Sequence, residues 1–144
     1  IIVVIGAGWM VVSGTTLVRG FVERKDADLA TVKWLRAQLP PNAILLTFGF
    51  TLTARHYSDL ETIDLSETDP VAIAQLAAEK RPIYALIDVT NVETQWQDQL
   101  PSTNFHWLRD GAGLEPVGES QTYTLFRARL PVAATKPGSS SGAT

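Results

Sequence analysis

The first eighteen residues of the chain, Ile1 to Val18, contain no charged side chain. A helix that crosses the hydrocarbon core of a bilayer needs about 20 mostly apolar residues, and this run nearly has that length. Its glycines fit such a helix, because small residues let neighbouring membrane helices approach closely. We therefore expect residues 1–22 to form a transmembrane helix, the last one of a larger membrane region.

Other interpretations of this segment are open. A signal peptide ends in a small-residue cleavage site, which Val12-Ser13-Gly14 resembles poorly. The run Val3–Gly8 resembles the start of a dinucleotide-binding G-x-G-x-x-G loop, but Val11 stands where the third glycine belongs. A core helix of a soluble protein is a further alternative. The length of the uncharged run favours the membrane helix over all of them.

The composition of the remaining chain indicates one soluble domain, which we place at residues 26–130. Hydrophobic residues make up 45% of the sequence and charged residues 19%, so the domain can bury a core. The net charge of −3 argues against a nucleic-acid partner, because binding phosphates needs clustered Lys and Arg. Cysteine is absent, which excludes disulfides and thiolate metal sites. Residues 131–144 are small and polar, and we expect a disordered tail.

Short apolar runs bounded by Pro, Gly or Asn predict the strands. The runs Ala43–Phe48, Glu61–Leu65 and Ile83–Asp88 read as buried parallel strands. The last two runs, Leu114–Gly118 and Thr122–Arg129, read as a closing hairpin. With helices between the parallel strands, this order predicts an α/β fold: a small three-layer sheet with a parallel centre and an antiparallel edge.

Helical periodicity and boundary signals predict the first helix of the domain at Asp28–Leu39. Its apolar stripe includes Leu29, Val32 and Leu35, Asp26 or Asp28 is its predicted cap, and Pro40-Pro41 ends it. The charged residues before it, of both signs, read as a connector to the membrane helix.

Further helices are expected between the strands. Asp69 is a predicted N-cap with Pro70 at the first helical position, and the basic Lys80-Arg81 pair would complement the negative helix end. The inward stripe of this helix is predicted to be Val71, Ala74, Leu76 and Ala77. The other predicted segments are short or loose helices at Phe50–Tyr57 and Thr90–Gln99, and an apolar stretch Phe105–Leu108 that leads into a turn at residues 110–113.

Three residues are candidates for a ligand-binding site: Arg55, Tyr57 and Asp88. Asp88 ends a parallel strand at its carboxyl edge, where open α/β sheets bind ligands, and Arg55 and Tyr57 follow the first strand toward the same edge. A cluster of these groups would suit a sugar or a phosphate. The structural alternative is that Asp88 only caps a helix and that the other two belong to a solvated loop.

No catalytic residue is identifiable. No serine lies in a G-x-S-x-G elbow, and no pair of carboxylates is spaced for acid–base chemistry. His56 and His106 have no partner at metal-ligand spacing, so we expect no metal and no cofactor.

The order of these features resembles a known family. An apolar segment is followed by the helix end Trp34–Ala43, then by Tyr57 before Asp64-Leu65, the strand Ile83–Asp88 and the closing Tyr123–Arg127. This arrangement resembles the C-terminal extracytoplasmic domain of bacterial GT-C membrane glycosyltransferases. That group is similar to protein O-mannosyltransferases and aminoarabinose lipid A transferases.

The resemblance implies a multi-spanning enzyme of the cell membrane that takes a sugar from a polyprenyl-phosphate donor and passes it to an acceptor outside the cytoplasm. The family's catalytic acids lie far upstream, so none is carried onto this chain. The implied partners are membrane lipid and a polyprenyl-phosphate sugar or glycan acceptor. The alternative function is a single-span, membrane-anchored binding module without catalysis.

Overall fold

The computed structural model describes residue 22 and residues 24–131. The predicted transmembrane helix, residues 1–22, lies outside these residues except for residue 22, and so do residues 132–144 of the predicted tail. Within the described part of the chain, no helix combines the length and the apolar character that crossing a membrane requires. The membrane helix therefore stays a prediction.

The centre of the fold is a five-stranded mixed sheet with the strand order β2-β1-β3-β5-β4. The strands are β1 (Ile44–Thr47), β2 (Glu61–Asp64), β3 (Ile83–Ile87), β4 (Leu114–Ser120) and β5 (Tyr123–Ala128). Strands β2, β1 and β3 are parallel, β5 pairs antiparallel with β3, and β4 pairs antiparallel with β5. The predicted α/β fold with a parallel centre and an antiparallel edge hairpin is confirmed.

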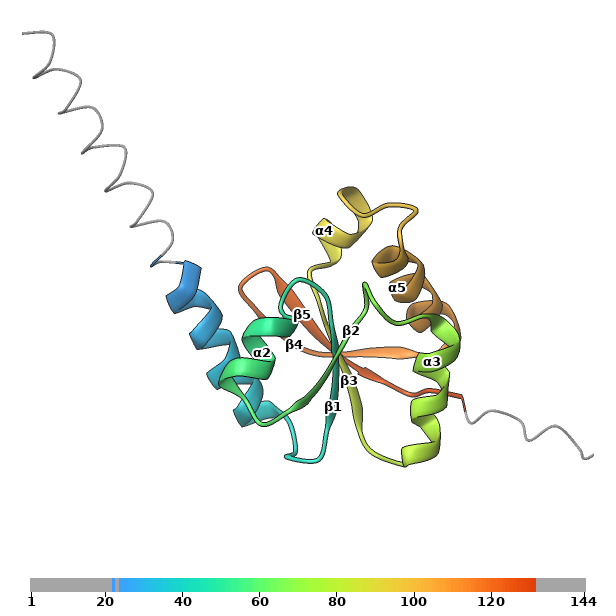
Figure 1. Ribbon diagram of the computed structural model, residues 1–144, viewed down its shortest axis with the longest axis horizontal. Coiled ribbons are helices and arrows are strands. Elements are labelled where there is room, and N and C mark those ends of the chain that lie inside the picture. The colour runs from blue at the N-terminus through green and yellow to red at the C-terminus, as the bar shows by residue number, and fades with distance from the viewer. Residues whose placement is uncertain (1–21, 23, 132–144) are drawn as a thin grey trace, which may run out of the picture.

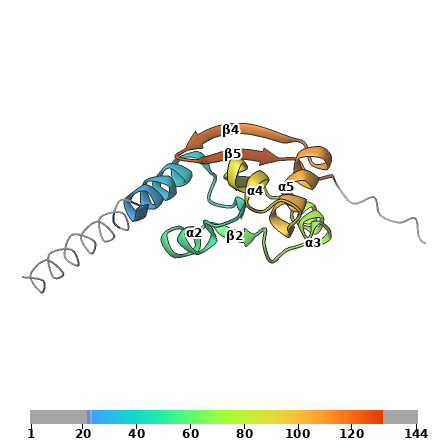
Figure 2. The ribbon, with the colours of Figure 1, turned by 90° about the horizontal axis from the view of Figure 1, so that it is seen from above.

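Helices cover both faces of this sheet (Figure 1). The first described helix, residues 24–38, and α2 (Thr51–Tyr57) lie on one face. The other face carries α3 (Pro70–Gln75), the 3-10 helix η1 (Leu76–Glu79), α4 (Val89–Thr94) and α5 (Leu100–Gly111). Figure 2 shows the same layers from above, with β4 at one margin of the sheet and α2 beside β2 at the other.

Alternation along the central strands builds a separate core on each face. In β1, Ile44 and Leu46 point into the cluster under α3 and α5, while Leu45 points into the cluster under the first helix. Leu86 of β3 and Leu125 of β5 join Leu45 in the second cluster, and all three are fully buried. The burial of Leu45 and Leu86 agrees with the buried strands predicted at Ala43–Phe48 and Ile83–Asp88.

The first helix begins earlier than predicted. Residues 24–28, which we expected to be a connector, are helical, so Asp26 and Asp28 lie inside the helix instead of capping it. The side chains of residues 24–26 in this turn are exposed to solvent. Mixed charge therefore marked an exposed helix face and not a break. The stripe is largely as predicted, with Val32 and Leu35 buried and Leu29 at the margin with 36% exposure.

Helix α3 has the predicted start and a different buried face. The Asp69 carboxylate accepts a hydrogen bond from the amide of Ala72 at 2.8 Å, as expected of an N-cap before Pro70. Ile73 is fully buried, whereas Val71, predicted to face inward, is 68% exposed. The predicted stripe was therefore wrong at Val71 and omitted Ile73, whereas Leu76 packs against the core as predicted.

The region after β3 contains two helices where one loose helix was predicted. Helix α4 ends at Thr94, and α5 runs from Leu100 to Gly111, through the predicted Phe105–Leu108 stretch and into the predicted turn. The sequence signals for this helix are Pro101 at its start and the apolar residues Phe105 and Leu108 on its buried face.

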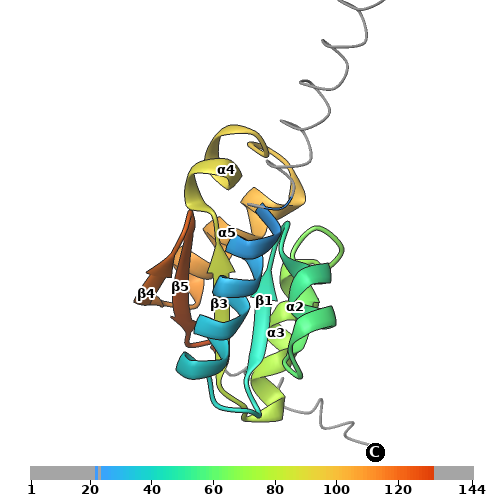
Figure 3. The ribbon, with the colours of Figure 1, turned by 90° about the vertical axis from the view of Figure 1, so that its left-hand side faces the viewer.

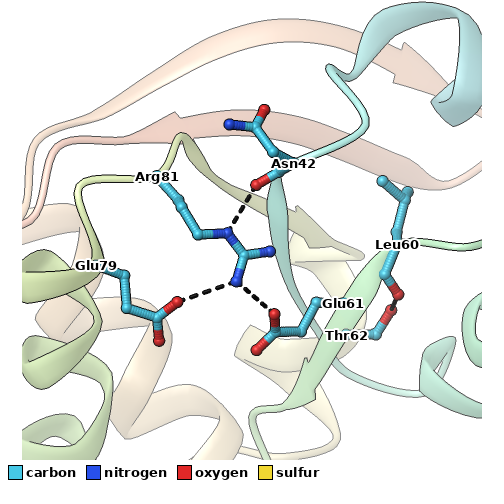
Figure 4. A network of polar contacts seen from close by, with 6 residues as sticks. All are labelled: Asn42, Leu60, Glu61, Thr62, Glu79 and Arg81. Atoms are coloured by element: carbon cyan, nitrogen blue, oxygen red, sulfur yellow. Dashed lines mark hydrogen bonds and ion pairs between the residues drawn. The ribbon is translucent and has the colours of Figure 1, made fainter.

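The amino edge of the parallel strands is closed by Arg81 (Figure 4). Its guanidinium donates to the Asn42 carbonyl at 2.9 Å, to Glu79 at 3.0 Å, and to Glu61 on β2. The contacts of Arg81 differ from the expected role at a helix end: they tie the loops before β1 and β3 to strand β2. Its side chain is 28% exposed, which leaves little of it accessible to a ligand.

Candidate functional site

The carboxyl edge of the parallel strands gathers several chain segments at one end of the molecule. The first part of the first helix lies at this edge. The contact that shows this is between the Thr31 hydroxyl and the Ser120 hydroxyl at the end of β4, which are 3.1 Å apart. Ser120 pairs with Tyr123, which begins β5 next to the end of β3. Figure 3 shows the start of this helix at the end of the sheet to which the β3 arrow points.

Asp88 occupies this edge as predicted. It follows β3 and caps α4, accepting a hydrogen bond from the amide of Asn91 at 3.0 Å. The capping role that we weighed as the structural alternative is therefore present. Asp88 also lines an open cleft of about 510 Å³, together with Thr90, Asn91, Thr94, Gln95 and Thr122. The first four of these partners come from α4 and its end, and Thr122 comes from the turn between β4 and β5.

Tyr123 lies between this cleft and the first helix. Its ring packs against Phe50, with the ring centroids 5.2 Å apart. Burial, and then the nearby carboxylates of Asp28 and Asp88, raise the pKa of the Tyr123 phenol. The phenol therefore stays protonated in neutral solution and offers a hydrogen-bond donor beside two negative charges.

Arg55 lies beside the edge strand and away from the cleft of Asp88. Its guanidinium donates twice to the carbonyl of Thr62 in β2, at 3.2 and 3.0 Å. These bonds join α2 to β2 and leave Arg55 with a structural role that its position after β1 did not reveal.

Tyr57 lines a second hollow, between the first helix and α2. The hollow has a volume of about 210 Å³ and is lined by Arg24, Lys25, Asp28, Thr53 and Tyr57. The ring of Tyr57 also packs edge-on against His56, at a centroid distance of 4.5 Å. The structure thus distributes Arg55, Tyr57 and Asp88 over three places and does not bring them into one hollow. The reason is that Arg55 turns to the Thr62 carbonyl on β2, while Tyr57 faces the hollow beside the start of the first helix.

Asp64 is a second carboxylate at the carboxyl edge. Burial disfavours its charged form, but hydrogen bonds from the Ser66 hydroxyl and amide outweigh burial, and the Arg55 charge assists them. The pKa of Asp64 is therefore lowered. These bonds hold the chain in a turn after β2, and Asp64 lines no hollow of the edge described above.

Asn104 was missed in the sequence because it follows the polar Ser102 and Thr103 in α5, and nothing local distinguishes a buried asparagine from an exposed one there. It is fully buried, and its amide donates to the carbonyls of Leu65 and Thr68 at 2.8 and 2.6 Å. Asn104 therefore fixes the loop that follows β2. A buried polar residue inside a helix is the signal that identifies such an anchor.

The described residues hold no group of three His, Cys, Asp or Glu side chains that could bind a metal. Searches of protein-family models, of curated proteins and of solved structures found no match to this chain. Inference about function therefore depends on the chemistry of this edge.

Proposed function

We propose that this chain is the accessory soluble domain of an integral membrane glycosyltransferase that uses a polyprenyl-phosphate sugar donor. The observation that carries the proposal is the position of the first helix, which begins at the carboxyl edge of the sheet beside the cleft of Asp88. A membrane segment at Ile1–Val18 ends a few residues before that helix. Such a segment would hold the carboxyl edge toward the membrane-embedded part of the enzyme.

The second hollow supports a lipid partner at the same end. Arg24 and Lys25 line it, and no ion pair among residues 24–131 involves either side chain. Basic residues beside a membrane helix attract the phosphate groups of lipids. The proposal places Arg24 and Lys25 next to membrane lipid or the phosphate of the donor. Its placement of the domain at the outer face of the cell membrane rests on the family resemblance alone.

The transfer chemistry is assigned to the parent enzyme outside this chain. Neither hollow of the carboxyl edge contains a nucleophile that is hydrogen-bonded to a base. The domain would act by closing the acceptor side of the active site and positioning its ligands.

The test is sugar transfer by the complete parent enzyme, purified in detergent, from a polyprenyl-phosphate sugar. The double variant Arg24→Gln and Lys25→Gln should raise KM for this donor several-fold, because it loses two phosphate-directed charges. Lys33→Gln is the matched control, since Lys33 is an exposed lysine of the same helix outside the hollow. This chain alone should transfer nothing. A parent without transferase activity, or transfer by this chain alone, would contradict the proposal.

A membrane-anchored binding module without catalysis is the second candidate. The cleft of Asp88 favours this candidate. Binding a ligand needs no nucleophile paired with a base, and the cleft contains no such pair. The upstream reading frame separates the two candidates: many further apolar spans support the transferase, and a start codon directly before Ile1 supports the module.

A further inference from the structure

The cleft of Asp88 is lined by residues with polar side chains. Its side chains are hydroxyls, carboxamides and one carboxylate: Asp88, Thr90, Asn91, Thr94, Gln95 and Thr122. No basic side chain and no large apolar side chain contributes to it. Its volume of about 510 Å³ falls within the range of about 300–1,000 Å³ that is typical of small-molecule sites.

This lining excludes most classes of ligand. A phosphate or carboxylate needs cationic partners, and the charge of Asp88 repels it. A calcium ion takes about 6–8 oxygen ligands and is bound mainly by carboxylates, of which the cleft has one. An apolar ligand would leave the polar side chains without partners. A neutral ligand rich in hydroxyl groups is the class that remains.

The hydrogen-bonding state of the lining favours a ligand with many donors. One oxygen of Asp88 accepts the Asn91 amide, which leaves the carboxylate with capacity for further donors. The Thr94 hydroxyl donates to the Thr90 carbonyl at 2.7 Å, so its lone pairs are the groups left to accept.

Asn91 adds an acceptor without a partner. Its side-chain oxygen is buried and has no hydrogen bond among the described residues. A buried acceptor left without a donor is unfavourable, and the last torsion of an asparagine side chain turns easily. Because Asn91 lines the cleft, a rotation about this torsion would let the oxygen accept a hydrogen bond from a ligand bound there.

We propose that the cleft of Asp88 binds a neutral sugar unit, with Asp88, Asn91 and Thr94 accepting hydrogen bonds from its hydroxyl groups. The cleft opens between α4 and the turn of the β4–β5 hairpin, which supplies Thr122. The binding itself is independent of the parent enzyme. Only the role of the sugar, as part of a glycan acceptor, rests on the proposed function.

Binding is tested on the full chain by amide chemical shifts in NMR, in a detergent without a sugar head group. The probes are the methyl glycosides of glucose, galactose and mannose, with glucuronate and inorganic phosphate as charged counterparts. At least one neutral glycoside at up to about 100 mM should shift the amides of the cleft residues, while glucuronate and phosphate should not.

Two variants and a control locate the binding. Asp88→Asn removes the charge but keeps a good helix cap, and it should weaken binding about tenfold, as expected for a lost charge-assisted hydrogen bond. Thr94→Val should weaken it about fivefold. Thr103→Val, on the exposed side of α5 and outside the cleft, should leave binding unchanged.

Several results would overturn the assignment: no shift with any neutral glycoside, larger shifts with phosphate or glucuronate, or equal losses in Thr103→Val and Thr94→Val. Failure of this inference and of the proposed function are distinguishable. A parent that transfers sugar beside a cleft that binds none rejects the sugar cleft alone. A cleft that binds sugar in a protein without transferase activity rejects the transferase and leaves the binding module.

Discussion

The two edges of the parallel sheet are built for different purposes. At the amino edge, the Arg81 guanidinium spans Asn42, Glu61 and Glu79, so its donors are used within the protein. At the carboxyl edge, the cleft of Asp88 and the hollow of Arg24 and Lys25 are open to ligands. Charged groups that bind each other stabilise loops, whereas polar groups at open hollows are available for recognition. The exposure of a polar side chain and its hydrogen-bond partners, more than its residue type, thus separate structural polar groups from those available to a ligand.

The largest expected effect is at the core that joins both edges. Leu86→Ala removes a fully buried side chain of β3, the strand that pairs with both β1 and β5. We expect it to lower the free energy of unfolding by about 2–5 kcal/mol, because the cavity left cannot fully collapse. Denaturant unfolding measures this loss. Leu52→Ala, at a side chain that is 80% exposed, should change stability little; equal effects would reject the assigned packing.

We expect a smaller loss of stability from Asn104→Ala. This variant tests whether part of the carboxyl edge has a structural role. The substitution leaves the carbonyls of Leu65 and Thr68 without their donor. Stability should fall by about 1–3 kcal/mol. Thr103→Ala, at the exposed neighbouring position, is the control in the same thermal melts. A neutral Asn104→Ala would show that the loop after β2 does not need this anchor.

Asp88 should tolerate loss of its charge but not loss of its cap. Asp88→Ala is expected to cost about 1 kcal/mol, since α4 loses the acceptor for the Asn91 amide. Asp88→Asn should stay close to the unsubstituted protein, because asparagine caps helices equally well. The urea midpoints of the two variants distinguish a capping role of Asp88 from a structural need for its charge. A large loss of stability in Asp88→Asn would show that the charge itself is needed.

At the amino edge, Arg81→Ala should lower the melting temperature at low salt, because it removes contacts to the Asn42 loop, to Glu61 of β2 and to Glu79 of η1. Most of the difference should disappear at about 1 M salt, where screening is strong. Arg36→Ala, which removes a single ion pair with the almost fully exposed Asp59, should have a smaller effect. Equal effects of both variants would remove the distinction between the network and an ordinary surface pair.

The smallest expected effect is a pH dependence from Asp64. Its pKa in the folded state lies below the ordinary value of 3.8, so the folded protein favours the charged form. The resulting stabilisation is present above that value and is lost as the pH falls through the folded pKa. Asp64→Asn should therefore flatten stability against pH on the acid side, without altering the shape of the curve near neutrality. An unchanged acid limb would show that Ser66 and Arg55 do not favour the carboxylate.

Local signals in the sequence predicted much of the fold. The apolar runs around Leu45 and Leu86 predicted the central strands, because only a strand covered on both faces is apolar throughout. Asp69 and Pro70 predicted the start of α3, since capping depends on a few neighbouring residues. The sequence also placed Asp88 at the carboxyl edge, which follows from its position at the end of a parallel strand.

Partners distant in sequence were decided only by the tertiary structure. The bond of Arg55 to Thr62, the network of Arg81 and the approach of Thr122 to α4 depend on how helices turn over the sheet. A rotation of one residue moves a side chain by about 100° around a helix, so short helices such as α2 and α3 leave its direction undetermined in the sequence. Composition and local pattern thus determined the elements and their order, while packing decided which polar side chains bind each other and which line a cleft.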